Sequence, residues 1–480
     1  MTTPIGRYTS PLGTRYASPT MQALWSAQHR AGLWRRLWLA LAEAERDLGV
    51  AIPEAAVAAM RAHLDDTDLA AVRTHEQRLR HDVMAHIHHF GDQAPDARAH
   101  LHLGATSCFV TDNADLIVLR DACRLLLGRM RDALHALRGF AATHADLPTL
   151  AYTHYQPAQL TTVGKRATLW AFDLALDAAA LLTVVETLPF RGCKGTTGTQ
   201  ASFLELFGGD DAKVRELDRR VAAAFGFDSS VPVSGQTYSR KLDARVLDTW
   251  AAIGQSVSKL GNDLRLLQHE GEVLEPAESA QVGSSAMPYK RNPMRAERMC
   301  ALGRYLISLR ENTAYTAATQ WLERTLDDSA NRRLVLPDAA LAADAVLLLA
   351  GDVARGLEVR TPTVRRNVER MMPYMATERW LMLGVTAGGD RQALHEVIRR
   401  HSWAAREAED RGEPGTLLER LAADPAFAGL DSAALRRELD PDRYVGRAPA
   451  QVREYLAEHL DPLLSRLEPF AVNDAAGVTV

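Results

Sequence analysis

Helical periodicity dominates this chain, and the alternation that marks β-strands is scarce. In the clearest example, between residues 242 and 270, apolar side chains recur at alternating steps of four and three: Val246, Trp250, Ile253, Val257, Leu260, Leu264 and Leu267. This spacing predicts a long helix that packs against other helices at a shallow angle. We therefore predict an all-α fold, with further long helices at about 111–146, 159–188, 294–316 and 338–357.

Breaks in the pattern divide the chain into three predicted domains. Ser18-Pro19 supplies an N-cap and a first position for one N-terminal helix that carries apolar residues from Leu33 to Leu48 and stops at Gly49. Loop-like segments lie at 91–95 and 103–107, and Arg360-Thr361-Pro362 opens a stretch of shorter helices. We expect an N-terminal helical domain at 1–107, a central helical bundle at 108–359 and a C-terminal helical domain at 360–480.

The predicted central helices are long enough to form an elongated bundle. At 1.5 Å per residue, several of them would measure about 40–50 Å. A bundle of this shape from one chain would leave an apolar flank exposed, so we expect the chain to oligomerise through it. A self-contained bundle with no functional oligomer stays open on the pattern alone.

Composition limits the classes of ligand. Of the 480 residues, 47% are apolar and 24% are charged, which is ordinary for a globular protein. The net charge is −4, from 56 basic and 60 acidic residues. Nucleic-acid-binding proteins are usually basic or carry a basic stripe, so this balance argues against that class. An anionic ligand must therefore be bound by arginine and lysine gathered locally.

The cysteines and the apolar runs indicate a cytoplasmic protein. Four cysteines lie far apart, form no CxxC pair and fit neither a disulfide framework nor a zinc site of ordinary spacing: Cys108, Cys123, Cys193 and Cys300. The first residues are polar, with no secretory signal. The most apolar run, 339–350, contains Asp344 and is too short to span a bilayer, so we expect no membrane contact.

The segment Gly283 to Pro293 is the most informative for function. It begins with a glycine, has few apolar side chains and gathers two hydroxyls, a lysine, an arginine and an asparagine. This composition predicts a mobile loop that presents an oxygen base and cationic donors to an anion.

Other polar segments interrupt the helices, and each is ambiguous by itself. His154 precedes a predicted helix, where it could be an acid or base, or simply a cap or surface residue. Four histidines lie at His81, His86, His88 and His89, but they lack zincin spacing and carboxylates at ligand spacing, which favours solvated or hydrogen-bonded histidines over a metal site.

Two further segments suggest anion binding. Gly195 to Gln200 is rich in glycine and hydroxyls but lacks the lysine ending of a P-loop, so a nucleoside-triphosphatase is weakly supported. Arg324 and Arg333 flank the hydroxyl of Ser329, and their forked donors suit a phosphate or a carboxylate. A solvated charged turn explains this last segment equally well.

Taken in order, the polar segments resemble the adenylosuccinate lyase family of the fumarase/aspartase superfamily. The resemblance runs from near residue 10 to near residue 460. The loop at 283–293 is shared by the whole superfamily, whereas the forms of 195–200 and 324–333 resemble adenylosuccinate lyases, closest to the animal-type branch. The segments that carry the resemblance are 10–19, 80–86, 103–107, 153–159, 194–200, 283–293 and 323–333.

The resemblance implies a three-domain all-α fold and a homotetramer whose active sites each draw on three chains. It implies β-elimination of fumarate from adenylosuccinate, giving AMP, and from the succinyl-carboxamide-imidazole ribotide, giving AICAR. No cofactor and no metal are implied, because side chains and backbone supply the base, the acid and the charge clamps. The partners implied are a nucleotide substrate and further copies of the chain, with no nucleic acid and no membrane.

The resemblance also assigns roles to residues. Ser284 would be the base and His154 the acid, with Lys290 stabilising the alkoxide, Glu297 orienting His154 and His81 contacting the substrate. The remaining family binding positions fall on Arg15, Tyr16, Arg80, Asp82, Thr106, Ser107, Gln236, Asn292, Arg298, Arg324, Ser329 and Arg333.

Two alternatives remain. One is a lyase of the same superfamily that acts on another N-succinyl substrate in a specialised pathway, against which Arg324, Ser329 and Arg333 favour a nucleotide. The other is a non-catalytic structural homologue, which the intact Ser284 and His154 argue against.

Overall fold

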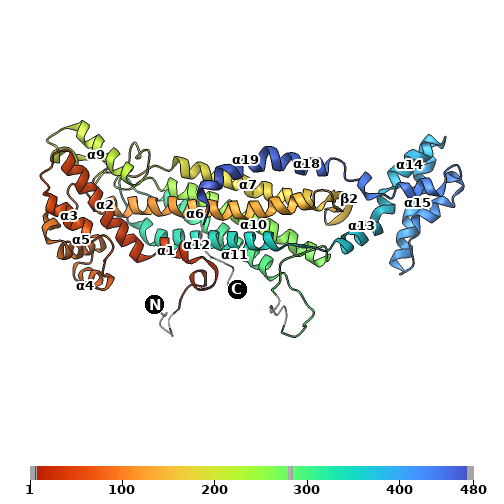
Figure 1. Ribbon diagram of the computed structural model, residues 1–480, viewed down its shortest axis with the longest axis horizontal. Helices are drawn as coiled ribbons and strands as arrows, with labels where there is room; N and C mark the ends of the chain where they lie inside the picture. Colours follow the sequence, from red (N-terminus) through yellow and green to blue (C-terminus); the bar gives the residue numbers. More distant parts are fainter. Residues whose placement is uncertain (1–5, 7, 279–280, 282–284, 473–480) are drawn as a thin grey trace.

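The structure is a computed structural model that describes residues 6, 8–278, 281 and 285–472. Five long helices lie along one another and form an elongated bundle (Figure 1). The all-α fold class is confirmed. The five helices are α6 (Ser107–Thr143), α7 (Val163–Thr187), α10 (Lys241–His269), α11 (Met294–Ala318) and α12 (Asp327–Gly356).

The apolar stripes predicted for these helices form one continuous core. The seven a and d residues of α10, from Val246 to Leu267, are all buried. Glycines bring α10 and α11 close together, because a Cβ on Gly303 would lie 2.2 Å from the Ser258 hydroxyl oxygen. The predicted bounds of these two helices agree with the structure to within two residues.

Shorter helices cover one end of the bundle (Figure 1). A second apolar core joins them to α6 and to the segment 190–238 that follows α7. The elements at this end are α2 (Ala27–Asp47), α3 (Glu54–Ala62), α4 (Leu69–Leu79), α5 (Asp82–Gln93), η2 (Pro95–His100), α8 (Ala201–Leu206) and α9 (Asp211–Ala224). Before α2, the chain forms η1 (Leu12–Tyr16) and α1 (Pro19–Leu24), which contact α12.

The opposite end holds most of the C-terminal helices (Figure 1). They have an apolar core of their own around Trp380 and Phe427. This end comprises α13 (Thr361–Met375), α14 (Thr377–Thr386), α15 (Arg391–Asp410), α16 (Leu417–Ala422), η3 (Pro425–Phe427), α17 (Ser432–Arg437) and η4 (Pro441–Arg443). The chain then returns along α6 and α7 as α18 (Ala448–Tyr455), η5 (Leu456–Leu460), α19 (Asp461–Leu467) and η6 (Glu468–Phe470). The three domain boundaries stay a prediction.

Four short strands accompany the helices. β1 (Pro148–Thr153) and β2 (Gln156–Thr162) form an antiparallel hairpin, and β3 (Val273–Leu274) pairs with β4 (Glu358–Val359). The helix predicted from residue 159 was wrong at its start. The chain stays extended to Thr162, whose hydroxyl accepts the Lys165 N–H at 3.1 Å and caps α7.

Two other helix boundaries differ from the prediction. Ser18 does cap the first helix, since its hydroxyl accepts the Met21 N–H at 3.1 Å. However, that helix ends at Leu24, and Ser26 caps a new one by accepting the His29 N–H at 3.1 Å. Helix α12 begins at Asp327 rather than near residue 338. The prediction missed its first turns because they carry polar side chains, several of which face a cavity.

Helices α7 and α12 are long and apolar enough to cross a membrane by length and composition. The apolar stretch of α12 is 72% buried inside the protein, so packing in the bundle accounts for it. Apolar side chains are nevertheless exposed on the bundle, as predicted. They include Leu169, Phe172 and Leu176 on α7, and Trp321, Leu322, Leu326 and Leu334 around the start of α12.

Candidate active site

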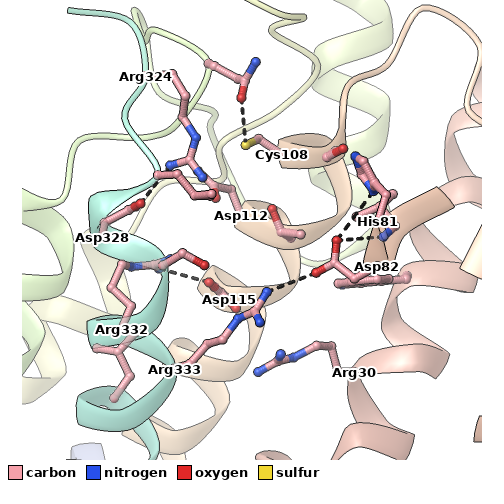
Figure 2. Close-up of a pocket in the computed structure, with 18 of the residues that line it drawn as sticks. Arg30, His81, Asp82, Cys108, Asp112, Asp115, Arg324, Asp328, Arg332 and Arg333 are labelled. Carbon is pink, nitrogen blue, oxygen red and sulfur yellow. Dashed lines mark hydrogen bonds and ion pairs between the residues drawn. The ribbon is translucent and has the colours of Figure 1, made fainter. Parts of the chain in front are cut away.

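A cavity of about 520 Å³ opens where the N-termini of α5, α6 and α12 meet (Figure 2). Most of the binding residues predicted from polar segments far apart in the sequence line it together. Thr106 is the N-cap residue of α6, immediately before one of the lining residues. The predicted residues that line the cavity are Arg80, His81, Asp82, Ser107, Gln236, Arg324, Ser329 and Arg333.

A tight turn between α4 and α5 directs one group of these residues. Arg80 ends α4 in the left-handed region, with a φ of 54°. His81 then caps α5, because its Nδ1 accepts the Met84 N–H at 3.3 Å. The next residue, Asp82, pairs with Arg333 of α12 at 3.0 Å. This ion pair joins two opposite walls of the cavity.

Gln236 is fixed by two other loops. Its backbone N–H donates to the Glu323 carbonyl at 2.9 Å, and its side-chain Nε2 donates to the Thr196 carbonyl at 2.9 Å. A Cβ on Gly235 would lie 2.6 Å from the Glu323 carbonyl oxygen, so a glycine is needed for this approach. The segment considered above as a phosphate cradle, 195–200, therefore uses one of its carbonyl groups to orient an amide side chain.

A buried chain of charges holds Arg324. Its Nη1 lies 2.9 Å from Asp328 Oδ1, and the other carboxylate oxygen of Asp328 lies 2.7 Å from Arg240 Nε. Arg240 also donates to both oxygens of Asp112 at 3.2 Å. Arg240, Asp112 and Asp328 are all buried. Because each charge has a partner, the Arg324 guanidinium is presented to the cavity in a defined orientation.

Arg332, which also lines the cavity, forms a second buried cluster. Its Nε lies 2.7 Å from Asp243, and its Nη2 lies 3.0 Å from Asp115. The Tyr238 hydroxyl donates to Asp243 at 2.6 Å, which completes the set. Arg332 lies in α12, whereas Arg324 lies in the segment just before this helix, and only Arg324 is a predicted ligand.

Two neighbouring carboxyls of α6 respond differently to burial. Burial acts to raise the pKa of Asp112, but Arg240 and Arg332 outweigh it and the pKa is lowered. Burial also acts on Asp115, and there it prevails over Arg332, so its pKa is raised.

Cys108 donates to Gln236 Oε1 at 3.4 Å, and burial raises the pKa of its thiol to about 11. The thiol therefore stays protonated and can keep donating this bond.

The predicted loop lies elsewhere on the bundle. Its proposed base, Ser284, lies outside the described residues. Lys290 and Asn292 border a small pocket just before α11. Glu275 fixes the start of that helix, because its two carboxylate oxygens accept the Arg295 and Ala296 N–H groups at 3.0 and 2.9 Å.

The first turn of α11 carries two more predicted residues. Glu297 is exposed there, and Arg298 extends over the Tyr16 ring at 5.9 Å from its centroid. Arg15 is adjacent to Tyr16 in η1. These four residues therefore gather near the loop, at the start of α11 and not at the cavity.

His154 lies at the tip of the β1–β2 hairpin, exposed and with a φ of 53°. The cavity lies at the start of α6 and the hairpin follows its end; this helix has 37 residues, or about 55 Å. The loop and the cavity are likewise at opposite ends of α11, whose 25 residues span about 37 Å. Within the described part of a single chain, the predicted contact between Glu297 and His154 is not formed.

The histidine-rich segment has local partners instead of a shared ligand. The His88 ring stacks on that of His75 in α4, with 5.9 Å between the ring centroids, and His89 Nε2 accepts the Asp68 N–H at 3.1 Å. His86 packs edge-on against Trp34, and burial lowers its pKa to about 4. No group of three possible metal ligands occurs among the described residues.

Sequence reasoning missed several residues around the cavity. A usable signal was present, because carboxylates interrupt the first turns of the otherwise apolar helix α6 and arginines follow the polar segment at 234–238. Only the fold shows that these charges meet. The missed residues are Arg30, Cys108, Asp112, Asp115, Arg240, Asp328 and Arg332.

The fold and the sequence both define a class. Residues 16–305 match the family described as Lyase, which is more than half of the chain. The 3-carboxy-cis,cis-muconate lactonizing enzyme of Pseudomonas putida has the same fold, with a TM-score of 0.79 over 96% of this chain and 99% of that one, at 23% identity. The protein is thus a lyase with the fumarase-type helical fold.

More specific matches identify the family. Residues 373–455 match the family described as Adenylosuccinate lyase C-terminus. The chain is 45% identical over 479 residues to the adenylosuccinate lyase of Schizosaccharomyces pombe, covering 99% of both. It is 44% identical to that of Schistosoma mansoni, covering 95% of this chain and 96% of the relative. The chain belongs to the adenylosuccinate lyase family, which confirms the resemblance expected from its polar segments.

Proposed function

We propose that this lyase eliminates fumarate from adenylosuccinate, giving AMP, and from the succinyl-carboxamide-imidazole ribotide, giving AICAR. The observation that carries the proposal is the cavity at the N-termini of α5, α6 and α12, where Arg324, Ser329 and Arg333 converge with His81 and Gln236. Forked donors beside a hydroxyl suit a phosphate, which favours a nucleotide over a smaller N-succinyl substrate.

The elimination needs a base and an acid. Ser284 acts as an alkoxide, which Lys290 stabilises when the loop covers the substrate, and it removes a proton from the succinyl carbon to leave a carbanion-like intermediate. His154 protonates the departing nitrogen, and Glu297 orients and charges this histidine. Positive donors aimed at the succinyl carboxylates stabilise the carbanion-like intermediate.

A homotetramer would bring these groups together. In one chain the cavity lies about a helix length from the loop and from the hairpin, whereas these two both contact the end of α10, through Arg291 and Tyr155. More than one chain is therefore needed to build one site, and the family resemblance implies three. The exposed side chains of Trp321, Leu322 and Leu326, just before α12, support this, because exposed apolar surface of this kind is expected to be covered by another subunit. The four cysteines, which are all free thiols, support a cytoplasmic location.

The direct test is to add adenylosuccinate to the purified protein and follow the purine absorbance band while assaying fumarate. Loss of adenylosuccinate with stoichiometric fumarate and AMP is expected. A lyase that ignores adenylosuccinate but cleaves another N-succinyl compound would support the alternative substrate. No fumarate from any such compound would support the non-catalytic alternative.

A further inference from the structure

The arginines that line the cavity fall into two groups. Four of the six are held by carboxylates: Arg240 and Arg324 by Asp328, Arg332 by Asp115, and Arg333 by Asp82. Within the part of the chain that the structure describes, the other two, Arg30 and Arg80, have no side-chain hydrogen bond or ion pair. Arg80 is a binding residue expected from the family resemblance, but Arg30 was not expected to have any role.

Arg30 is placed firmly. It lies in the first turns of α2, which Ser26 caps, and its backbone N–H donates to the Ser26 carbonyl at 3.1 Å. The next residues of the helix, Ala31 and Trp34, are buried in the apolar core. Figure 2 shows Arg30 extending toward the cavity from the side opposite α12, with no interaction drawn to another side chain. Its backbone therefore needs no rearrangement to bind a ligand.

The surrounding charges leave Arg30 available for an anion. The nearby carboxylates of Asp82 and Asp115 already accept from Arg333 and Arg332 at 3.0 Å. A guanidinium in a partly enclosed cavity loses hydration, and a bound anion compensates for that loss. An arginine with no protein partner gains this interaction without first breaking another.

We propose that Arg30 binds the phosphate of the nucleotide substrate, together with Arg333 from the opposite wall. A phosphate has three terminal oxygens, so it can accept from two guanidinium forks at once, whereas one fork already satisfies both oxygens of a carboxylate. This assignment rests on the proposed function, because it takes the cavity to be the nucleotide site.

The test compares Arg30→Gln and Arg30→Lys with Arg36→Gln. Arg36 is a suitable control, since it lies on the same helix and pairs with Asp65 at 2.6 Å, away from the cavity. Calorimetry measures the binding of AMP and of adenosine, and steady-state kinetics measure kcat, KM and inhibition by fumarate. Thermal melting shows that each variant is folded.

Arg30→Gln is expected to raise the Kd for AMP and the KM for adenylosuccinate by roughly tenfold to a hundredfold, because a hydrogen-bonded charge is lost. The kcat, the affinity for adenosine and inhibition by fumarate should change less than about threefold. Arg30→Lys should fall between Arg30→Gln and wild type, since it keeps the charge but loses the fork. Arg36→Gln should match wild type.

Unchanged AMP affinity in Arg30→Gln would overturn the assignment, as would a loss confined to fumarate inhibition or to kcat. If Arg30→Gln does not fold, the same readouts on Arg30→Lys decide, and wild-type AMP affinity there would overturn the bidentate contact. Failure of the proposed function looks different, because the wild-type protein would then release no fumarate from adenylosuccinate.

Discussion

The cavity at α5, α6 and α12 and the β1–β2 hairpin differ in how far one chain completes them. In the cavity, Arg324 is oriented by Asp328 and Arg333 by Asp82, so the groups proposed to bind the nucleotide are already in place. At the hairpin tip, His154 is exposed, and it lies about one α6 length from these groups. The comparison supports the proposal that one chain can bind a nucleotide but needs other chains to react with it.

The largest expected effect comes from the two proposed proton-transfer groups. His154→Ala and Ser284→Ala should each lower kcat by at least about a hundredfold, because each removes a proton-transfer group. AMP affinity should remain close to wild type, since the cavity residues are untouched. Turnover near wild type in either variant would remove that residue from its assigned role.

A smaller effect is expected from the support of the cavity. Asp328→Asn removes the charge between Arg240 and Arg324, so KM for adenylosuccinate should rise about tenfold while kcat falls less. Asp338→Asn is a matched control, because Asp338 is on the same helix and accepts only an exposed bond from Tyr305, at 2.9 Å. Equal kinetics for the two variants would show that Asp328 does not orient Arg324.

The smallest effect on turnover is expected at Glu45, a buried residue of α2 away from the cavity. Neither of its carboxylate oxygens has a hydrogen-bond partner among the described residues, and burial raises its pKa from 4.5 to about 8. The raised folded-state pKa stabilises the protein below pH 4.5, and this contribution is lost as the pH rises through about 8.

Glu45→Gln carries no titrating proton at this position. The difference in unfolding free energy between this variant and wild type should therefore shift in favour of the variant by up to about 4 kcal/mol between pH 5 and pH 8. Denaturant unfolding at the two pH values measures this, with kcat unchanged. A constant difference between the two proteins at both pH values would contradict a neutral buried carboxyl.

The contrast between cavity and hairpin also separates what the sequence could predict from what it could not. Helices α10 and α11 were predicted closely, because their apolar residues repeat without interruption. The β1–β2 hairpin was missed, because its tip at 153–156 is short, polar and exposed and shows no alternation. The start of α12 was missed because its first turns are polar, which is the property that lets them line the cavity.

The site shows the same division. Arg324 and Arg333 were found because they lie in a recognisable polar segment. Arg240 and Asp112 were missed, because the energetic reason for a buried charge is a partner more than a hundred residues away. That His154 would lie so far from the cavity could not be predicted from order along the chain, since the separation depends on how the long helices run.

The most direct test of a site shared between chains is subunit mixing. Equal amounts of His154→Ala and Ser284→Ala protein are dissociated, mixed and reassembled, and fumarate production is compared with each variant alone. If different chains supply the two residues, random assembly leaves about one site in four with both, so about a quarter of wild-type activity should return. Activity no higher than that of the separate variants, after subunit exchange is verified by mass spectrometry of the mixed tetramers, would contradict the account.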